Sequence, residues 1–481
     1  MKIHEKVGLT FDDVLLVPKH SKIASRKNIR TNTWLTPQIQ LAIPIISANM
    51  DTVTESEMAI AMARAGGIGI LHRFMTIPQQ AEMVQRVKRA ESFIVEHPLT
   101  ISAKATLEEA SRIMKESDIG GLVVVDNEHH LIGLLTTRDI LLAPSMDVPV
   151  ENAMTPRARL IVAHRDEPFS NARDTLYQHR IEKLPLVDKE DHIVGLVTAQ
   201  DLFKIHEHPE ATKDQKGRLR VGAAIGVNPS DLERAKSCAE AGVDVLVVDV
   251  AHGHMDSVLE MVRILKKEIP SLPVIAGNVA TAEGVEDLAQ AGADAVKVGV
   301  GSGSICITRI VTGFGIPQLT AIEECSEIGK KLGIPIIADG GIRNSGDITK
   351  ALAAGASSVM LGSLLSGTKE SPGATIFRNG QNYKVVRGMA SLTANITRRE
   401  VEQQSEIDWD EWSEVIPEGV EAVVPYRGNL REVLHQLLGG LRSGMSYCGA
   451  LTLPELIEKA EFIQITRSGQ IESGVHDVTV L

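Results

Sequence analysis

The chain has few cysteines, no long hydrophobic run and no excess of positive charge, and each absence excludes a class of protein. Four cysteines without a Cys-x-x-Cys pair exclude a disulfide framework and predict a reducing compartment, the cytoplasm. No apolar stretch approaches the roughly 20 residues of a membrane helix, and the first residues lack the apolar segment of a secretory signal. The net charge of −12 excludes a general nucleic-acid-binding protein, although it leaves room for one basic phosphate pocket.

The length of the chain predicts more than one domain, because single hydrophobic cores rarely grow beyond about 250–300 residues. The 481 residues are 43% hydrophobic and 23% charged, which is ordinary for a globular protein. Residues 123–141 resemble residues 185–203, with Asp126 and Asp188 at equivalent positions. Neither copy of this repeat can bury its apolar face alone, so we expect the two to pack as a pseudo-symmetric pair.

Outside the repeat, β-branched apolar runs alternate with amphipathic helical patterns, which is typical of a parallel sheet covered by helices. These runs end in glycine or polar residues and lie at 41–54, 243–253, 272–281, 293–303, 334–343 and 357–367. Because one run precedes the repeat, we expect the repeat to be an insertion into an α/β domain. We favour a closed (β/α)₈ barrel over an open doubly wound sheet, although the pattern of runs suits both.

The predicted domains follow from this arrangement. Residues 1–92 and 206–481 are expected to form the barrel, and residues 93–205 the inserted domain, with a polar linker at 206–218. Residues 392–428 include an acidic stretch that is long enough to be a mobile flap over a site. A solvated loop would have the same composition, so both interpretations stay open.

In both architectures the chemistry lies at the carboxyl ends of the strands. The polar and reactive residues expected there are Asp249, Asn278, Cys306, Asp339 and the pair Gly362–Ser363. Asp339 could accept hydrogen bonds from ribose hydroxyl groups. The glycine-rich turns that follow these strands could bind a phosphate through their backbone amides, although each of them alone could be a simple turn.

Cys306 is the strongest candidate for a reactive side chain. It lies in the glycine-rich stretch GVGSGSICITR, residues 299–309, where the backbone can approach a ligand closely and the thiol stays accessible. A thiolate in that setting is a nucleophile. The other three cysteines lie in helical or apolar contexts and are expected to be buried as small hydrophobic residues: Cys238, Cys325 and Cys448.

The remaining titratable residues give weaker indications. Glu418, which precedes Gly419 in the predicted flap, is the carboxylate that we expect to transfer protons. His72, His252 and His254 have no partners at the helical spacing of a zinc site, so we expect no zinc there. His252 and His254 are expected to contact residues of the site and not the ligand itself.

Eight motifs together resemble the IMP dehydrogenase/GMP reductase family over essentially the whole chain. They are LTFDDVLLVP (9–18), SANMDTVTE (47–55), DVAHGH (249–254), GNVAT (277–281), GVGSGSICITR (299–309), ADGGIR (338–343), GSLLSGTKESPG (362–373) and YKVVRGMAS (383–391). The resemblance implies a (β/α)₈ barrel with an inserted pair of CBS modules, and a cysteine thiolate that bonds to C2 of a purine nucleotide. Dehydrogenases of the family pass hydride from IMP to NAD⁺ and hydrolyse the adduct to XMP. Reductases expel ammonia from GMP, receive hydride from NADPH and release IMP.

The two branches differ in how they treat water, and the sequence favours the reductase branch. Family dehydrogenases activate water with an Arg-Tyr pair on the flap, but none of the four tyrosines here follows an arginine: Tyr177, Tyr383, Tyr426 and Tyr447. Asn49, where dehydrogenases usually have proline, and residues 249–251 also resemble reductases. The length of the flap and residues 470–478 resemble dehydrogenases, and Ser302 and Val386 depart from the family pattern.

The resemblance also assigns roles to residues. It makes Cys306 the nucleophile and gives Thr308 and Glu418 the task of handling the departing ammonia. The nucleotide is expected to contact Met50, Ser304, Asp339, Gly341, Gly362, Ser363, Gly388, Met389 and Gly419. NADPH, or NAD in the dehydrogenase alternative, is expected near Asp249, Asn278 and Lys297. A potassium ion is expected on the backbone carbonyl groups of Gly301, Gly303 and Cys306.

The inserted pair resembles sensors of adenine or guanine nucleotides. Its candidate contacts are Thr136, Asp139, Thr198 and Asp201, and a purely structural dimerisation module is the alternative. The resemblance implies a homotetramer or an octamer, and we expect neither a nucleic-acid nor a membrane partner. Three functions stay open, namely GMP reductase, which we favour, IMP dehydrogenase, and a non-catalytic nucleotide sensor. The intact loop around Cys306 argues against the third.

Overall fold

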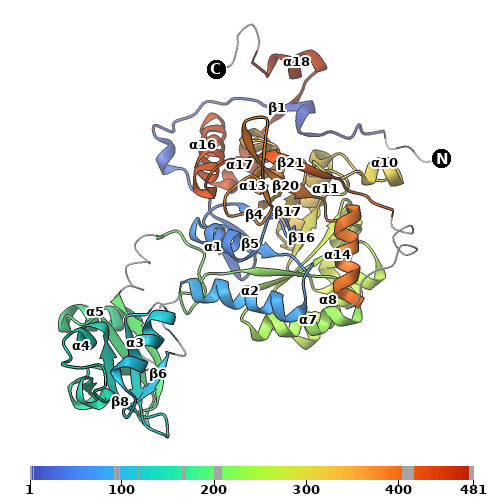
Figure 1. Ribbon diagram of the computed structural model, residues 1–481. Coiled ribbons are helices and arrows are strands. Elements are labelled where there is room, and N and C mark those ends of the chain that lie inside the picture. The colour runs from blue at the N-terminus through green and yellow to red at the C-terminus, as the bar shows by residue number, and fades with distance from the viewer. Residues whose placement is uncertain are drawn as a thin grey trace. The chain divides into compact units, whose positions relative to one another are not determined.

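The computed structural model describes residues 3, 5–91, 95, 98–117, 119–164, 169–199, 208–403 and 416–475. The chain divides into two compact units (Figure 1). The barrel unit comprises residues 1–90, 210–214 and 219–481, and the inserted unit comprises residues 91–209 and 215–218. Among the described residues, no helix combines the length and the apolar character needed to cross a lipid bilayer.

Eight parallel strands close into a barrel, which confirms the closed (β/α)₈ prediction over the open sheet. In their order around the barrel they are β13 (Gly222–Ile225), β14 (Val245–Asp249), β15 (Val274–Val279), β16 (Ala295–Val298), β17 (Ile336–Asp339), β18 (Ser358–Leu361), β4 (Ile45–Ser47) and β5 (Ile68–Leu71). Parallel pairing of β18 with β4 and of β5 with β13 completes the ring. Strands β5 and β13, which precede and follow the inserted unit in the chain, therefore lie side by side.

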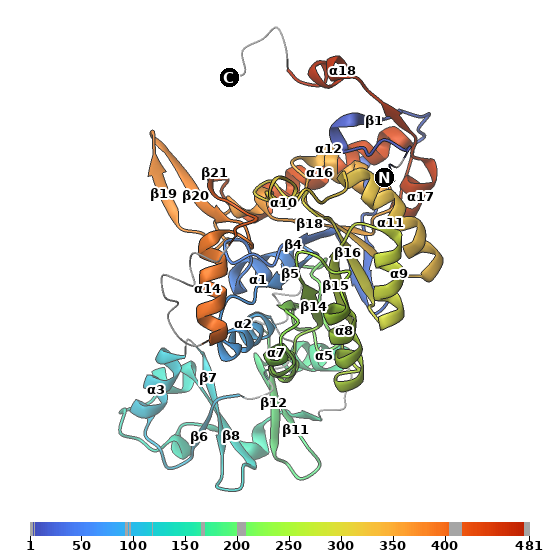
Figure 2. The same cartoon turned by 90° about the vertical axis from the view of Figure 1, so that its right-hand side faces the viewer.

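Helices cover the outside of the barrel. They are α1 (Ser56–Arg64), α2 (Ile77–Ala90), α7 (Pro229–Glu240), α8 (Asp256–Glu268), α9 (Ala282–Ala291), α11 (Gln318–Leu332), α12 (Ser345–Ala353) and α16 (Leu430–Cys448). Figure 2 shows α8 and α9 beside strands β14 to β16. The shorter elements are η1 (Phe11–Asp13), β1 (Val14–Leu16), η2 (Arg26–Asn28), β2 (Thr33–Thr36), β3 (Ile39–Leu41), α10 (Thr308–Thr312), α13 (Ser363–Ser366), α17 (Leu453–Lys459), β22 (Phe462–Gln464) and α18 (Arg467–Glu472).

The strands are apolar throughout because both of their faces are buried. On β14, Val245 and Val247 point into the barrel, whereas Leu246 and Val248 pack against the outer helices. The hairpin of β2 and β3 adds its own side chains to the core inside the barrel, among them Leu35. Because this hairpin immediately precedes β4, it fills the amino-terminal end of the barrel. The carboxyl end of the barrel is left for a site.

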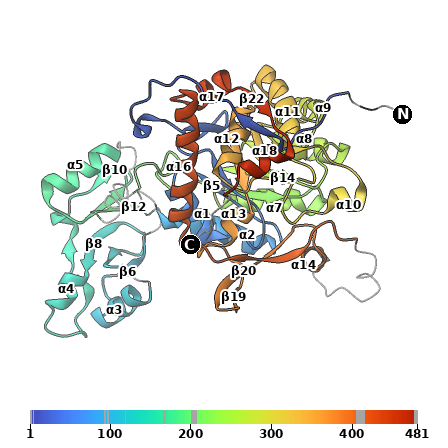
Figure 3. The same cartoon turned by 90° about the horizontal axis from the view of Figure 1, so that it is seen from above.

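Among the described residues between α13 and α16, the chain forms a three-stranded antiparallel sheet and one helix. The strands are β19 (Thr375–Arg378), β20 (Gln381–Arg387) and β21 (Glu421–Pro425), and the helix between β20 and β21 is α14 (Leu392–Gln403). In Figures 2 and 3, β19, β20 and α14 lie on the same side of the barrel. Residues 404–415, in the middle of the stretch predicted to form a flap, lie outside the described residues.

The inserted unit contains the sequence repeat. Its two sheets have the strand orders β6-β7-β8-β9 and β10-β11-β12. Their strands are β6 (Thr100–Ser102), β7 (Gly121–Val125), β8 (Leu131–Thr136), β9 (Thr155–Pro156), β10 (Ala163–His164), β11 (Lys183–Val187) and β12 (Ile193–Thr198). The helices in the described part of this unit are α3 (Leu107–Glu116), α4 (Thr137–Leu141) and α5 (Phe169–His179), with short turns η3 (Val150–Asn152) and η4 (Arg157–Arg159). The two equivalent hairpins meet at His130 and His192, whose rings stack with centroids 4.4 Å apart.

Candidate active site

A cavity of about 310 Å³ lies at the carboxyl ends of the barrel strands. Its walls include Asp249, Asn278 and Asp339 at the ends of three strands, and Met50 in the loop that follows β4. The loop after β16 and the segment after β20 supply further walls. The cavity is thus assembled from segments that are far apart in the chain, as strand-end sites in this fold are.

Glycines shape the loop that carries Cys306 into the cavity. Gly299 has a φ of +151°, and a Cβ atom there would lie 1.9 Å from the Asp339 carbonyl oxygen, so no larger residue fits. Gly301 has a φ of +73°, a left-handed conformation that glycine adopts without strain. The loop then tightens, because the amide of Cys306 donates to the carbonyl of Gly303 at 3.1 Å. The result is a half-buried thiol on the cavity wall.

Cys306 begins a chain of polar contacts. Its Sγ lies 3.2 Å from Thr308 Oγ1, and Thr308 Oγ1 donates to Glu418 Oε2 at 2.7 Å. Backbone pairing holds Glu418 in place, because its carbonyl accepts the amide of Ile307 at 2.8 Å and its own amide donates to Ala390 at 2.9 Å. A proton can therefore pass between the carboxylate and the region of the thiol through one hydroxyl group.

The other cysteines are buried away from this chemistry. Cys238 and Cys325 are fully buried, and burial raises the pKa of each thiol to about 12. Burial also raises the pKa of Cys448. These three thiols stay protonated and unreactive near neutral pH, whereas Cys306 faces the cavity.

A buried lysine organises the floor of the cavity. Lys297, which is 2% exposed, donates to Asp339 Oδ2 at 2.6 Å, pairs with Asp249 Oδ1 at 2.7 Å and donates to Asn278 Oδ1. Burial disfavours the charged amine, but the two carboxylates outweigh burial and raise the pKa of Lys297. Burial likewise works against the ionised form of Asp249, yet Lys297 and a 2.6 Å hydrogen bond from Asn49 lower its pKa. The cluster is therefore charged and rigid.

Replacing the buried Lys297 by methionine should destabilise the barrel, because it leaves two half-buried carboxylates without their cation. The loss of one partner of a buried ion pair typically costs about 3–5 kcal/mol. We expect a loss of this size in the free energy of unfolding, measured by urea denaturation. Lys236→Met, which removes an exposed pair with Glu268, should cost less than about 1 kcal/mol. Equal effects of the two substitutions would contradict the structural role of Lys297.

Comparison of the sequence with known proteins assigns the chain to a family. Residues 8–476 match the model of the IMP dehydrogenase / GMP reductase domain. The chain belongs to the IMP dehydrogenase/GMP reductase family. It is 53% identical to the inosine-5′-monophosphate dehydrogenase of Nitrosopumilus maritimus over 99% of both chains. It is 46% identical to the GMP reductase of Leishmania major over 98% of both chains.

A solved structure agrees with the family assignment. The crystal structure of a cysteine-to-alanine variant of GMP reductase from Trypanosoma brucei, in complex with guanosine 5′-monophosphate, superposes with a TM-score of 0.90. It is 44% identical to this chain, and the match covers 98% of each chain. The chain is therefore an oxidoreductase of a family that uses nicotinamide cofactors.

Most residues assigned through the family resemblance line this cavity. Beyond the residues already placed, these are Gly301, Gly303, Gly388, Met389 and Gly419. Ser304, Gly341, Gly362 and Ser363 are not among its lining residues. Three of these lie beside it: the hydroxyl groups of Ser304 and Ser363 are 3.2 Å apart, and a Cβ atom on Gly362 would come within 3.1 Å of the Met50 sulfur.

Several lining residues were missed in the sequence, and four of them have large polar or aromatic side chains. Arg73 and Phe74 directly follow the short strand β5, and Asn395 and Arg398 lie on α14. The position after a barrel strand could have revealed the first two, but β5 itself was not recognised. The helical spacing of Asn395 and Arg398 was hidden in a stretch interpreted as a loop.

The candidate contacts in the inserted unit are only partly described. Thr136 ends β8, and Asp139 Oδ2 accepts from both the amide and the hydroxyl group of Thr136, at 2.8 and 2.7 Å. Thr198 ends β12, at the equivalent position of the second copy. Asp201 lies outside the described residues.

Proposed function

We propose that this chain is a GMP reductase, which converts GMP to IMP and ammonia with NADPH. The observation that supports it is the contact chain from Cys306 through Thr308 to Glu418, which suits the protonation of a departing amine. The sequence lacks the Arg-Tyr pair with which family dehydrogenases activate water. A site that can protonate ammonia but not activate water favours the reductase reaction.

The proposed reaction has two steps. The Cys306 thiolate forms a bond to C2 of GMP, and the C2–N2 bond breaks as the amino group leaves as ammonia with a proton delivered through Thr308 from Glu418. NADPH, when bound, supplies the hydride that reduces C2 of the resulting thioimidate. The sulfur–carbon bond then breaks, which frees IMP and restores the thiolate. The balance is GMP, NADPH and two protons to IMP, NADP⁺ and ammonium.

The nucleotide contacts are proposed from the family resemblance and from their place around the cavity. Asp339 would accept hydrogen bonds from the ribose hydroxyl groups. The phosphate would be bound by Ser304, Gly341, Gly362 and Ser363. Met50, Gly388, Met389 and Gly419 would surround the base. The residues assigned to the base and Asp339 line the cavity. Ser304, Gly341 and Gly362 each lie next to a residue of its walls, and the Ser363 hydroxyl group is 3.2 Å from that of Ser304.

The cavity fits the two groups that the family implies. Asp249, Asn278 and Lys297 lie in its walls together with Cys306, so a nicotinamide ring there would face the purine. A potassium ion would be held by the carbonyl oxygens of Gly301, Gly303 and Cys306, which belong to one tight loop and are of the ligand type that potassium prefers. The Gly303 carbonyl already accepts one hydrogen bond and keeps a second lone pair.

IMP dehydrogenase is the alternative function, because the chain is 53% identical to a relative with that name. Assays in both directions separate the two. We expect GMP-dependent oxidation of NADPH at an ordinary enzymatic rate, with ammonia and IMP as products. Formation of XMP from IMP and NAD⁺ at a comparable rate would overturn the reductase assignment and leave the thiol chemistry intact.

For the inserted unit we propose a pair of CBS modules that binds adenine or guanine nucleotides at Thr136, Asp139, Thr198 and Asp201. The repeated hairpins, whose equivalent residues Thr136 and Thr198 both end a strand, support two related sites. We also propose a homotetramer, or an octamer formed through this unit. Nucleotide binding would raise the melting temperature of the protein in proportion to the logarithm of ligand concentration.

A further inference from the structure

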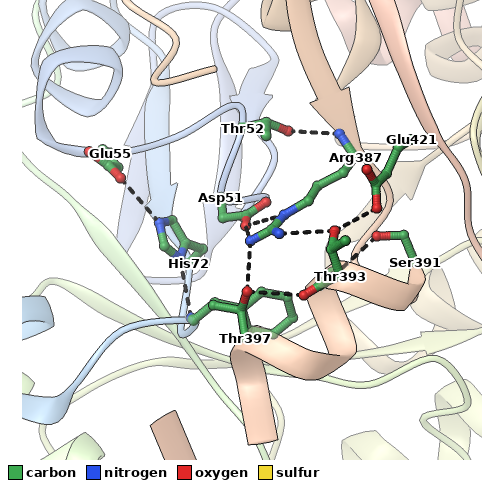
Figure 4. A network of polar contacts seen from close by, with 11 residues as sticks. Asp51, Thr52, Glu55, His72, Arg387, Ser391, Thr393, Thr397 and Glu421 are labelled. Atoms are coloured by element: carbon green, nitrogen blue, oxygen red, sulfur yellow. Dashed lines mark hydrogen bonds and ion pairs between the residues drawn. The ribbon is translucent and has the colours of Figure 1, made fainter. Parts of the chain in front are cut away.

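Arg387 joins three segments of the barrel unit (Figure 4). It ends β20, directly before Gly388 and Met389, which line the cavity. Its Nε donates to Asp51 Oδ2 at 2.7 Å, and its Nη2 donates to the same oxygen. Nη1 also donates to Thr393 Oγ1 at 3.1 Å.

Asp51 anchors this arginine to the loop after β4. The carboxylate is 9% exposed and the guanidinium 21%, so the pair is more shielded from water than a surface ion pair. The amide of Arg387 adds a 3.3 Å hydrogen bond to Thr52 Oγ1 in the same loop. Met50, the residue before Asp51, lines the cavity. The ion pair therefore fixes two walls of the cavity to each other.

The same guanidinium holds helix α14. Thr393 and Thr397 are one helical turn apart, so they lie on one face of the helix, and both accept from Arg387, Thr397 at 3.4 Å. Two other residues of α14, Asn395 and Arg398, line the cavity. The contacts to Arg387 therefore help to fix the orientation of α14, and with it the placement of this wall.

Thr393 connects Arg387 to β21, the strand that follows Glu418 in the chain. Its hydroxyl group accepts from Arg387 and donates to Glu421 Oε1 at 2.6 Å, which uses its single proton. Glu421 begins β21 and pairs with Arg387 across the sheet. Glu418 lies three residues earlier on the same segment. A displacement of β21 would therefore move the carboxylate that faces Thr308.

We propose that Arg387 is a positioning residue for the reaction, anchored by Asp51 and acting through Thr393. Its side chain hydrogen-bonds to Asp51, Thr393 and Thr397, none of which is an expected nucleotide contact. It holds α14 and the segment with Glu418 in one arrangement around the cavity. The proposal rests on the thiol chemistry of the family and not on which branch the chain belongs to. The effect of each substitution on kcat is therefore measured for whichever of the two conversions the wild-type enzyme catalyses.

The test compares two substitutions at one position in the full-length enzyme. Thr393→Val removes the hydroxyl group and keeps the shape, whereas Thr393→Ser keeps the hydroxyl group. We expect kcat to fall about tenfold in the valine variant, as befits one lost hydrogen bond to a charged group. The KM for the nucleotide should change less than about threefold, because the proposed phosphate and ribose contacts lie elsewhere. The serine variant should keep at least about half of the wild-type kcat.

Three outcomes would overturn the proposal. One is a wild-type kcat in Thr393→Val, and another is an equal loss in the serine variant. The third is a loss of kcat that accompanies a large fall in melting temperature, since a structural defect would then explain it. As a further check, Arg387→Lys keeps the charge opposite Asp51 but cannot reach both threonines, so its kcat should fall about as far as that of Thr393→Val. A wild-type enzyme that oxidises IMP and leaves GMP unchanged would refute the reductase assignment alone.

Discussion

Replacing Cys306 by alanine is expected to lower turnover by at least about 10⁴-fold, because no other thiol can form the bond to C2. The three remaining cysteines are buried, and burial raises the pKa of Cys238 and Cys325 to about 12. The measurement is steady-state oxidation of NADPH in the presence of GMP. Binding of GMP, measured by calorimetry, should weaken less than about tenfold, since the proposed phosphate and ribose contacts are untouched.

Cys448→Ala is the matched control. Its thiol lies at the end of α16 and outside the cavity-lining set, so its removal should leave turnover within about twofold of the wild type. Alkylation with iodoacetamide should modify one thiol in the native enzyme, and saturating GMP should protect it. Residual turnover above about a tenth of the wild-type rate in Cys306→Ala would show that another group attacks the purine.

The fold was predictable where strands are long and β-branched. The runs around β14, β15, β16, β17 and β18 are strands in the structure, because a strand buried on both faces must be apolar at every position. The run at 41–54 contains a strand of only three residues, β4, since Pro44 precedes it and polar residues follow it. Strand β13 was not recognised because three of its four residues, GAAI, are small. Strand β5 was not recognised because IGIL follows Gly66 and Gly67 and is interrupted by Gly69.

The candidate site was predictable where a motif lies at the end of a recognised strand. Asp249, Asn278 and Asp339 are such cases, and the structure brings all three to Lys297. Arg73 follows the unrecognised strand β5, so no local signal marked it. Arg387 shows a second limit, because its role comes from Asp51, which lies over 300 positions earlier in the chain. Pairings across such separations depend on the closure of the barrel, which local patterns do not encode.

Changing Glu418 to glutamine should separate the two halves of the proposed reaction. The variant keeps a hydrogen-bonding side chain opposite Thr308 but cannot supply a proton to ammonia. We expect kcat for GMP reduction to fall on the order of 10²–10⁴-fold, the usual contribution of a general acid. The hydride half of the reaction involves no ammonia. If the proposed reaction is run backwards from IMP, Cys306 would bond to C2 and bound NADP⁺ would accept the hydride, so the same adduct would remain on the enzyme.

The burst of NADPH from IMP and NADP⁺ therefore decides what Glu418 does. If Glu418 serves the departing ammonia, the glutamine variant should retain a burst close to one equivalent per active site, at a rate within about tenfold of the wild type. Cys306→Ala should give no burst. The contact chain also allows a second role, in which Glu418 deprotonates Cys306 through Thr308. In that case the burst would slow as much as GMP reduction does, and the assignment of Glu418 to ammonia would be wrong.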